Sequence, residues 1–141
     1  MARVDFYILR ESGNPTRQVF ACRLAEKAYR LEHRVHIHTA SRADAGRVDE
    51  LLWTFRDGSF VPHALLDGPP DELPPVTIGC EARSVDACDL LINLCEDIPD
   101  FAEAFPRVAE LVSADEDCKR EGRRRFASYR DRGHTIETHK V

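Results

Sequence analysis

The sequence has 141 residues, 43% of them hydrophobic, and its 20 basic and 25 acidic residues give a formal net charge of -5. A chain of this length buries roughly 70% of its unfolded surface, so one domain can form a core without disulfides or metal ions. The acidic balance argues against a protein whose whole surface coats nucleic acid or an anionic membrane, and no apolar run approaches the roughly 18 residues of a membrane span. We expect no membrane partner.

The first half of the chain alternates between strand and helix patterns. Strands are predicted over residues 3–9 and 33–39, and helices over residues 14–31 and 41–53. Asn14 is a suitable N-cap for the first helix, with Pro15 at its first helical position. Ser41 is the predicted cap of the second helix.

The second half continues this alternation with shorter elements. An extended segment is expected over residues 59–65, strands over 76–80, 89–94 and 108–112, and helices over 101–107 and 115–132. Pro62 excludes the extended segment from a central ladder position. Residues 89–94 form an apolar run flanked by acids, which is typical of a strand buried on both faces. Residues 134–141 show no strong pattern.

The order of elements predicts the fold class. We expect a single three-layer α/β domain over residues 1–141, with a mostly parallel or mixed sheet and helices on both faces. Such sheets often bind nucleotides beside a glycine-rich turn. Here the first strand leads into Arg-Glu-Ser-Gly-Asn-Pro at residues 10–15, and no G-x-x-x-x-G-K-[ST] sequence occurs. The fold is thus nucleotide-binding-like but lacks a phosphate loop.

Candidate metal ligands and nucleophiles lack partners in the sequence. His36 and His38 share one face of their predicted strand and His33 is near, so three imidazoles could hold zinc. No carboxylate or cysteine completes that set at ligand spacing, and the alternative is a polar strand face. Cys80 and Cys95 stand at apparent strand ends without a partnered base. We expect no metal, no cofactor and no catalytic residue.

The number of cysteines and the first residues indicate the compartment. Five cysteines form no Cys-x-x-Cys pair, which is typical of reduced thiols rather than of a disulfide scaffold or zinc ribbon. Asp5 stands where a signal peptide would have its apolar stretch. We therefore expect a cytoplasmic protein.

The last predicted helix concentrates positive charge. Residues 118–132 contain seven basic and two acidic residues, a net charge of +5, whereas the rest of the chain carries -10. Helical spacing places Lys119, Arg123, Phe126 and Arg130 on one face, with Tyr129 nearby. Guanidinium groups suit carboxylates and phosphates, and the acidic remainder of the chain favours a short acidic peptide over a long polyanion. The alternative is a solvated helix face with Phe126 or Tyr129 packed inward.

A second feature combines the single tryptophan with a following aromatic. Trp53 ends the second predicted helix, and Phe60 follows seven residues later in the extended segment. Apolar bulk near a sheet margin is either core or an exposed anchor for a protein partner.

Four stretches, in the same order along the chain, resemble the chi subunits of bacterial DNA polymerase III holoenzyme. The most specific is Ser-Phe-Val-Pro-His at residues 59–63, which follows the Leu-Trp helix end at 52–53. The other stretches are residues 6–9, 89–94 and 123–130. The resemblance therefore covers essentially the whole chain.

This resemblance implies a non-catalytic adaptor of the clamp-loader complex, with a nucleotide-binding-like fold that binds no nucleotide. It implies two partners: the psi subunit, and the acidic C-terminal tail of single-stranded-DNA-binding protein, which ends in a phenylalanine carboxylate. The matched positions on the psi side are Trp53, Phe60, Val61 and Pro62. The matched positions of the tail pocket are Val112, Lys119, Arg123, Phe126 and Tyr129.

The sequence departs from the family pattern beside Phe126. The family can place a lysine directly after this aromatic, where this chain has Ala127, and the aromatic itself is often tyrosine. Arg124 and Arg130 are the cations expected to compensate.

The sequence leaves other partners open. We expect contact with nucleic acid to be mainly indirect, and the alternative is direct binding of single-stranded nucleic acid by the basic helix, with Phe126 or Tyr129 stacking on bases. A small metal-dependent or thiol enzyme is a third class. Some relatives suggest a helicase on the Trp53–Phe60 surface.

Overall fold

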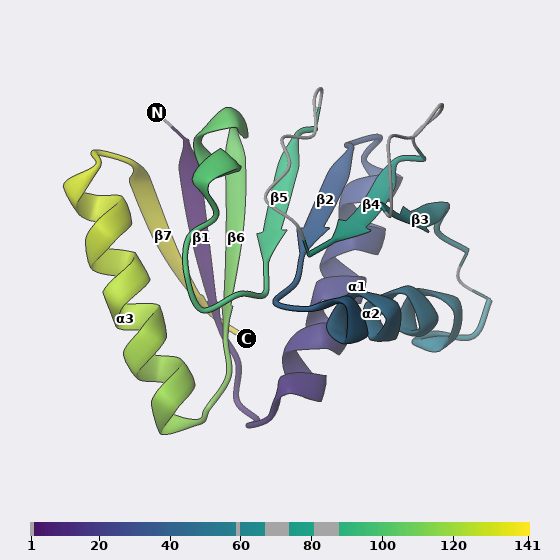
Figure 1. Ribbon diagram of the computed structural model, residues 1–141, viewed down its shortest axis with the longest axis horizontal. Helices are drawn as coiled ribbons and strands as arrows, with labels where there is room; N and C mark the ends of the chain where they lie inside the picture. Colours follow the sequence, from purple (N-terminus) through teal and green to yellow (C-terminus); the bar gives the residue numbers. More distant parts are fainter. Residues whose placement is uncertain (1, 59, 67–73, 81–87) are drawn as a thin grey trace.

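The computed structural model describes residues 2–58, 60–66, 74–80 and 88–141. Its strands are β1 (Arg3–Ile8), β2 (Val35–His38), β3 (His63–Leu65), β4 (Val76–Gly79), β5 (Leu90–Asn93), β6 (Arg107–Val112) and β7 (Thr135–Lys140). Its helices are α1 (Asn14–Arg30), α2 (Arg42–Thr54), α3 (Glu116–Asp131) and the short 3-10 helix η1 (Asp100–Ala104). The described strands form one parallel sheet in the order β3-β4-β2-β5-β6-β1-β7 (Figure 1).

Two hydrophobic cores lie on opposite faces of this sheet because side chains alternate along each strand. One face carries Val35 and Ile37 of β2 and packs against α1 and α2. The other face carries Phe6 of β1 and Leu91 of β5 and packs against η1 and α3. All four residues of β5 are buried, as expected for a strand covered on both faces. The predicted three-layer α/β architecture is confirmed.

The helix caps agree with the sequence in one case and differ in the other. The Ser41 hydroxyl accepts a hydrogen bond from the backbone N–H of Asp44 at 3.1 Å and caps α2, as predicted. The prediction for α1 is wrong, because Asn14 is already helical and the N-cap is Gly13. Gly13 has a φ of 99°, which L side chains rarely adopt, so the turn after β1 requires glycine there.

The two edge strands could be predicted to different degrees. β3 lies at the edge of the sheet, as Pro62 directly before it predicted. Proline has no backbone N–H to donate to a neighbouring strand, and an edge strand needs such bonds on one side only. Ser59, the first residue of the predicted extended segment 59–65, lies outside the described residues. β7 was not predicted. It pairs in parallel with β1, from Thr135 opposite Arg3 to Lys140 opposite Ile8, but only two of its residues are half-buried. An exposed edge strand carries little hydrophobic pattern for a sequence to show.

None of the described helices is long and apolar enough to cross a membrane.

The histidines of β2, for which the sequence left open a zinc site or a polar strand face, are buried against aromatic rings. The His38 ring lies 5.1 Å from Phe101, and the His36 ring lies 6.0 Å from Phe101 and 6.5 Å from Phe105. His36 Nδ1 lies 2.8 Å from the hydroxyl of Thr77. His33 instead lines a hollow beside α1, so the structure does not bring the three imidazoles together.

We expect His36 to make the fold sensitive to mild acid. Burial, with a smaller contribution from His38, lowers the pKa of His36 from 6.5 to about 4. Between these values the unfolded chain binds more protons than the folded chain, so the free energy of unfolding falls as the pH falls. The expected loss is roughly 3 kcal/mol across the window. Urea unfolding from pH 7 to 4 should show this slope, and His36→Gln should flatten it. An unchanged slope in that variant would contradict the assignment.

Candidate functional site

Helix α3 is fixed to the sheet by a buried polar network. Glu110 on β6 is fully buried and accepts hydrogen bonds from Arg125 at 2.9 Å, Tyr129 at 2.6 Å and Asn93 at 3.0 Å. Arg125 also donates to the backbone carbonyl of Glu96 at 2.9 Å. Burial raises the pKa of Glu110, and the Arg125 charge and these hydrogen bonds oppose that rise. The network therefore fixes which face of α3 is turned inward.

A pocket of about 290 Å³ lies beside this network, between α3 and the sheet. It is lined by Phe6 and Ile8 of β1, Val112 of β6, Thr138 of β7, and Lys119, Gly122, Arg123 and Phe126 of α3. The floor is apolar because alternate residues of parallel strands face α3, and Ile8 stands opposite Val112 in the β1–β6 register. The Phe6 and Phe126 rings lie 5.4 Å apart. Cations thus stand at the rim of an apolar hollow.

Gly122 permits the close contact on which the pocket depends. A Cβ atom at this position would lie 2.9 Å from Cγ2 of Val112, closer than real Cβ contacts. Only glycine therefore lets α3 approach β6 at this distance without a shift of the helix or of Val112.

The cations of α3 and of its C-cap residue Arg132 divide into paired and unpaired groups. The exposed guanidinium groups away from the pocket each have a carboxylate partner: Arg120 with Asp117 at 2.7 Å, Arg124 with Asp97 at 3.4 Å, Arg130 with Asp131 at 3.7 Å, and Arg132 with Glu103 at 3.5 Å. Arg123 has no ion-pair partner among the described residues, and the Lys119 ammonium lies 4.0 Å from Glu116. Among the exposed arginines of α3, Arg123 at the pocket rim is therefore the one that is free to bind an external anion.

The structure brings together four of the seven residues predicted for the tail pocket, namely Val112, Lys119, Arg123 and Phe126. Arg124 and Arg130 do not line it. Tyr129 is 1% exposed, and its hydroxyl donates a hydrogen bond to Glu110, so its side chain packs inward. The alternative stated above, that Phe126 or Tyr129 packs inward, therefore holds for Tyr129.

Sequence reasoning did not assign four other pocket residues, Phe6, Ile8, Gly122 and Thr138. The alternation of Phe6 and Ile8 along β1 indicates that they share one face of the sheet. The sequence did not predict the neighbouring strand β7, which supplies Thr138.

The second predicted surface is exposed. Trp53 and Phe60 are 57% and 65% exposed, and their rings lie 5.9 Å apart. Val61 is buried and Pro62 half-buried, so the chain is anchored directly after Phe60. His63 contacts the Trp53 ring at 4.7 Å and the backbone carbonyl of Asp49 at 3.1 Å. His63 and the buried Val61 therefore hold Trp53 and Phe60 in place at the surface.

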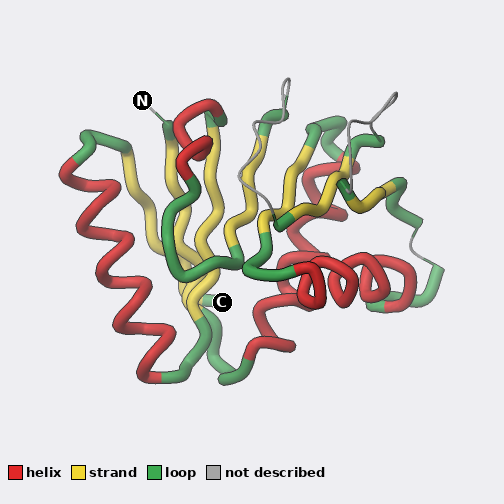
Figure 2. The backbone as a smooth tube through the Cα atoms, in the orientation of Figure 1, coloured by secondary structure: helices red, strands yellow, loops and turns green. Residues whose placement is uncertain are grey.

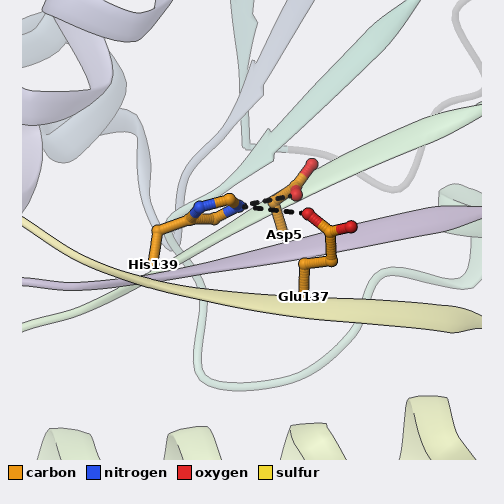
Figure 3. Close-up of side chains that lie close together, drawn as sticks. All are labelled: Asp5, Glu137 and His139. Carbon is orange, nitrogen blue, oxygen red and sulfur yellow. Dashed lines mark hydrogen bonds and ion pairs between the residues drawn. The ribbon is translucent and has the colours of Figure 1, made fainter.

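Three side chains at the β1–β7 edge lie close enough to suggest a metal site (Figure 3). Asp5, Glu137 and His139 form this group among the described residues, with His139 Nε2 at 2.9 Å from Asp5 and 3.9 Å from Glu137. Asp5 is also paired with Arg3 at 3.3 Å and Arg107 at 3.2 Å. Burial opposes ionisation of Asp5, but hydrogen bonds from His139, Arg107 and Arg3 lower its pKa. These two guanidinium groups already neutralise the cluster and would repel a metal ion.

Cys95 lacks the properties of a nucleophile. Burial, assisted by the nearby Glu110 carboxylate, raises the pKa of the Cys95 thiol to about 11. The thiolate, rather than the thiol, is the reactive form, so Cys95 is protonated at neutral pH.

Comparison with known proteins decides the family. The family model described as DNA polymerase III chi subunit, HolC, matches residues 1–137. The chain belongs to the DNA polymerase III chi subunit family. Proteins named DNA polymerase III subunit chi share 38% identity over 141 residues in Pseudomonas aeruginosa, 36% over 139 in Haemophilus influenzae and 33% over 143 in Escherichia coli. These alignments cover 97–100% of this chain and 96–98% of the relatives.

Membership of the chi family places the chain among the subunits of DNA polymerase III and implies a role in DNA replication. The resemblance seen in the sequence is thereby confirmed. A solved structure, the crystal structure of T4 UvsW, superposes with a TM-score of 0.68 at 10% identity. It covers 99% of this chain but 41% of that protein, and at this identity the likeness concerns the fold alone.

A methyl group at position 122 should disturb the pocket. We expect Gly122→Ala to lower the free energy of unfolding by roughly 1–3 kcal/mol, because the added Cβ overpacks against Val112. Because Val112 is itself a buried core residue, the double variant Gly122→Ala/Val112→Ala should lose less stability than the sum of the two single variants. Chemical unfolding measures both.

Gly46→Ala provides the matched control, because Gly46 is also helical and a Cβ there has nothing within 4 Å. It should gain about 0.5–1 kcal/mol. Equal behaviour of the two alanine variants would show that α3 does not need the close contact.

Proposed function

We propose that this chi-family chain is a non-catalytic adaptor. It holds the psi subunit of DNA polymerase III on the Trp53–Phe60 surface and the acidic C-terminal tail of single-stranded-DNA-binding protein in the α3 pocket. The observation that carries the proposal is the unpaired Arg123 at the rim of an apolar pocket, on a helix whose other exposed arginines are paired.

The chemistry of the pocket fits the end of such a tail. The terminal carboxylate pairs with Arg123, since guanidinium and carboxylate form charge-assisted hydrogen bonds. The phenylalanine ring enters the hollow between Phe6, Val112 and Phe126, where ring edges and methyl groups replace water. Lys119 then meets an acidic residue upstream. Exposed ion pairs are individually weak, so the affinity is on the order of micromolar.

The paired arginines argue against direct binding of single-stranded nucleic acid by α3. A phosphate backbone would have to displace Asp117, Asp97, Asp131 and Glu103 from their guanidinium partners. Those carboxylates would also repel the strand. A short peptide that binds Arg123 and Lys119 competes only with the 4.0 Å contact between Lys119 and Glu116.

The positions of the two surfaces support an adaptor. β3 and β7 are the opposite edges of the sheet (Figure 1). The Trp53–Phe60 surface lies on α2 and the segment before β3, whereas the pocket lies between α3 and the β1–β7 edge. The two partners therefore occupy opposite ends of one domain and can bind together.

Loss of the Arg123 guanidinium should abolish most tail binding. We expect Arg123→Ala to weaken a labelled peptide ending in Asp-Ile-Pro-Phe at least tenfold in fluorescence anisotropy, and amidation of the peptide terminus to weaken it similarly. Arg120→Ala is the matched control, because its guanidinium on the same helix already pairs with Asp117. Undiminished binding by Arg123→Ala would exclude the pocket as the tail site.

Truncation of the exposed aromatics should release psi selectively. We expect Phe60→Ala or Trp53→Ala to weaken psi about thirtyfold, the size typical of an aromatic hot spot, while tail binding is unchanged. Leu31→Ala is a suitable control, because Leu31 is a large exposed apolar residue outside this surface. Titration calorimetry with psi gives the comparison, and equal affinity in all three variants would refute this half of the proposal.

A further inference from the structure

A second hollow lies at the same end of the sheet as the tail pocket, on the opposite face. It has a volume of about 510 Å³ and combines apolar walls from Leu9, Pro15, Val19 and Phe20 with the cations Arg10 and Arg23. The proposed function does not use it.

The two hollows lie back to back around the end of β1. Ile8 lines the tail pocket and Leu9 lines the second hollow, and successive residues of a strand point to opposite faces. Thr138 of β7 lines the tail pocket, whereas Val141, directly after β7, lines the second hollow.

The loops that border the two hollows are bonded together. The backbone N–H of Ala114 donates to the Glu11 carbonyl at 3.0 Å, and that of Gly13 donates to the Asp115 carboxylate at 2.8 Å. Figure 2 shows the turn after β1 and the turn before α3 meeting below the same strand ends. The turns that border the two hollows are therefore held together at this end of the sheet.

Unpaired positive charge lies at the end of the sheet that carries both hollows. Arg10 and Arg23 are exposed and have no ion-pair partner among the described residues. Lys140 is likewise unpaired in the described part of the chain; it stands opposite Ile8 in the β1–β7 register. Glu11 is the acid among the residues that line the second hollow. Cations therefore border both hollows, Arg123 the tail pocket and Arg10 and Arg23 the second hollow, and Lys140 directly precedes Val141 of the second hollow.

We propose that the second hollow is a subsite for the acidic stretch upstream of the tail's last residues. This inference rests on the proposed function of the tail pocket. A sheet layer is about 10 Å thick and an extended peptide advances about 3.3 Å per residue, so roughly three residues pass the strand ends. The acidic side chains that follow meet Lys140, Arg10 and Arg23, and an apolar side chain among them packs against Phe20 and Val19.

Two peptides of different length test the subsite. One is the four-residue Asp-Ile-Pro-Phe, and the other extends it to about twelve residues with upstream aspartates. We expect the longer peptide to bind the full-length protein about three- to tenfold more tightly, with the difference lost at high salt. In Arg10→Gln/Arg23→Gln the gain should disappear, while the short peptide binds as before and so reports an intact fold. Glu11→Gln should increase the gain.

The matched control is Arg42→Gln/Arg47→Gln, which removes two exposed charges from α2. A gain that persists in Arg10→Gln/Arg23→Gln, or that falls equally in the control, overturns the subsite and leaves the tail pocket intact. Failure of both peptides to bind the unaltered protein overturns the proposed function and the subsite together.

Discussion

The ion pair between Glu110 and Arg125 is the constraint on which the functional face depends. Both side chains are buried, so loss of either partner would leave a charge without compensation, at a cost of about 3–5 kcal/mol. Arg125 is three residues from Gly122 and four from Tyr129, and these three are the buried residues of α3. Fixing this stripe against β6 fixes the rotation of the helix. Lys119, Arg123 and Phe126 are thereby directed to its flank over Val112.

The turn after β1 explains why a nucleotide-like sheet presents a different kind of site. In such folds the amides of this turn are the usual ligands for phosphate. Here the backbone N–H of Gly13 donates to Asp115, whose pKa is lowered by this bond and by one from the Ser113 hydroxyl. A carboxylate of the chain itself therefore occupies the position of an anionic ligand. The unpaired cations lie at the flanks of the strand end, where they can meet a carboxylate from another protein.

Periodicity predicted most of the fold because most elements bury one face or two. The apolar run 89–94 became β5, and the Ser41 cap began α2, because both signals are local. β7 could not be predicted in this way, since its side chains are largely exposed and its place is set by pairing with β1.

The candidate site was predictable only in part for a similar reason. Helical spacing gathered Lys119, Arg123 and Phe126. Arg124 was expected to compensate for Ala127, but its partner Asp97 lies 27 residues away, where no local pattern could reveal it. The inward direction of Tyr129 depends on Glu110, a charged residue within a buried strand. No local pattern contains that pairing.

The sheet also determines how the two proposed partners can influence each other. Its central strands β2 and β5 are buried on both faces, and interiors packed in this way deform little. Coupling between distant sites requires an element with two discrete arrangements, and the sheet between the Trp53–Phe60 surface and the α3 pocket offers packed strands instead. Binding at one edge should therefore leave affinity at the other unchanged. Any gain in overall affinity from binding both proposed partners then comes from effective concentration. A tail held in the α3 pocket keeps psi, on the other end of the domain, close to the protein that carries the tail.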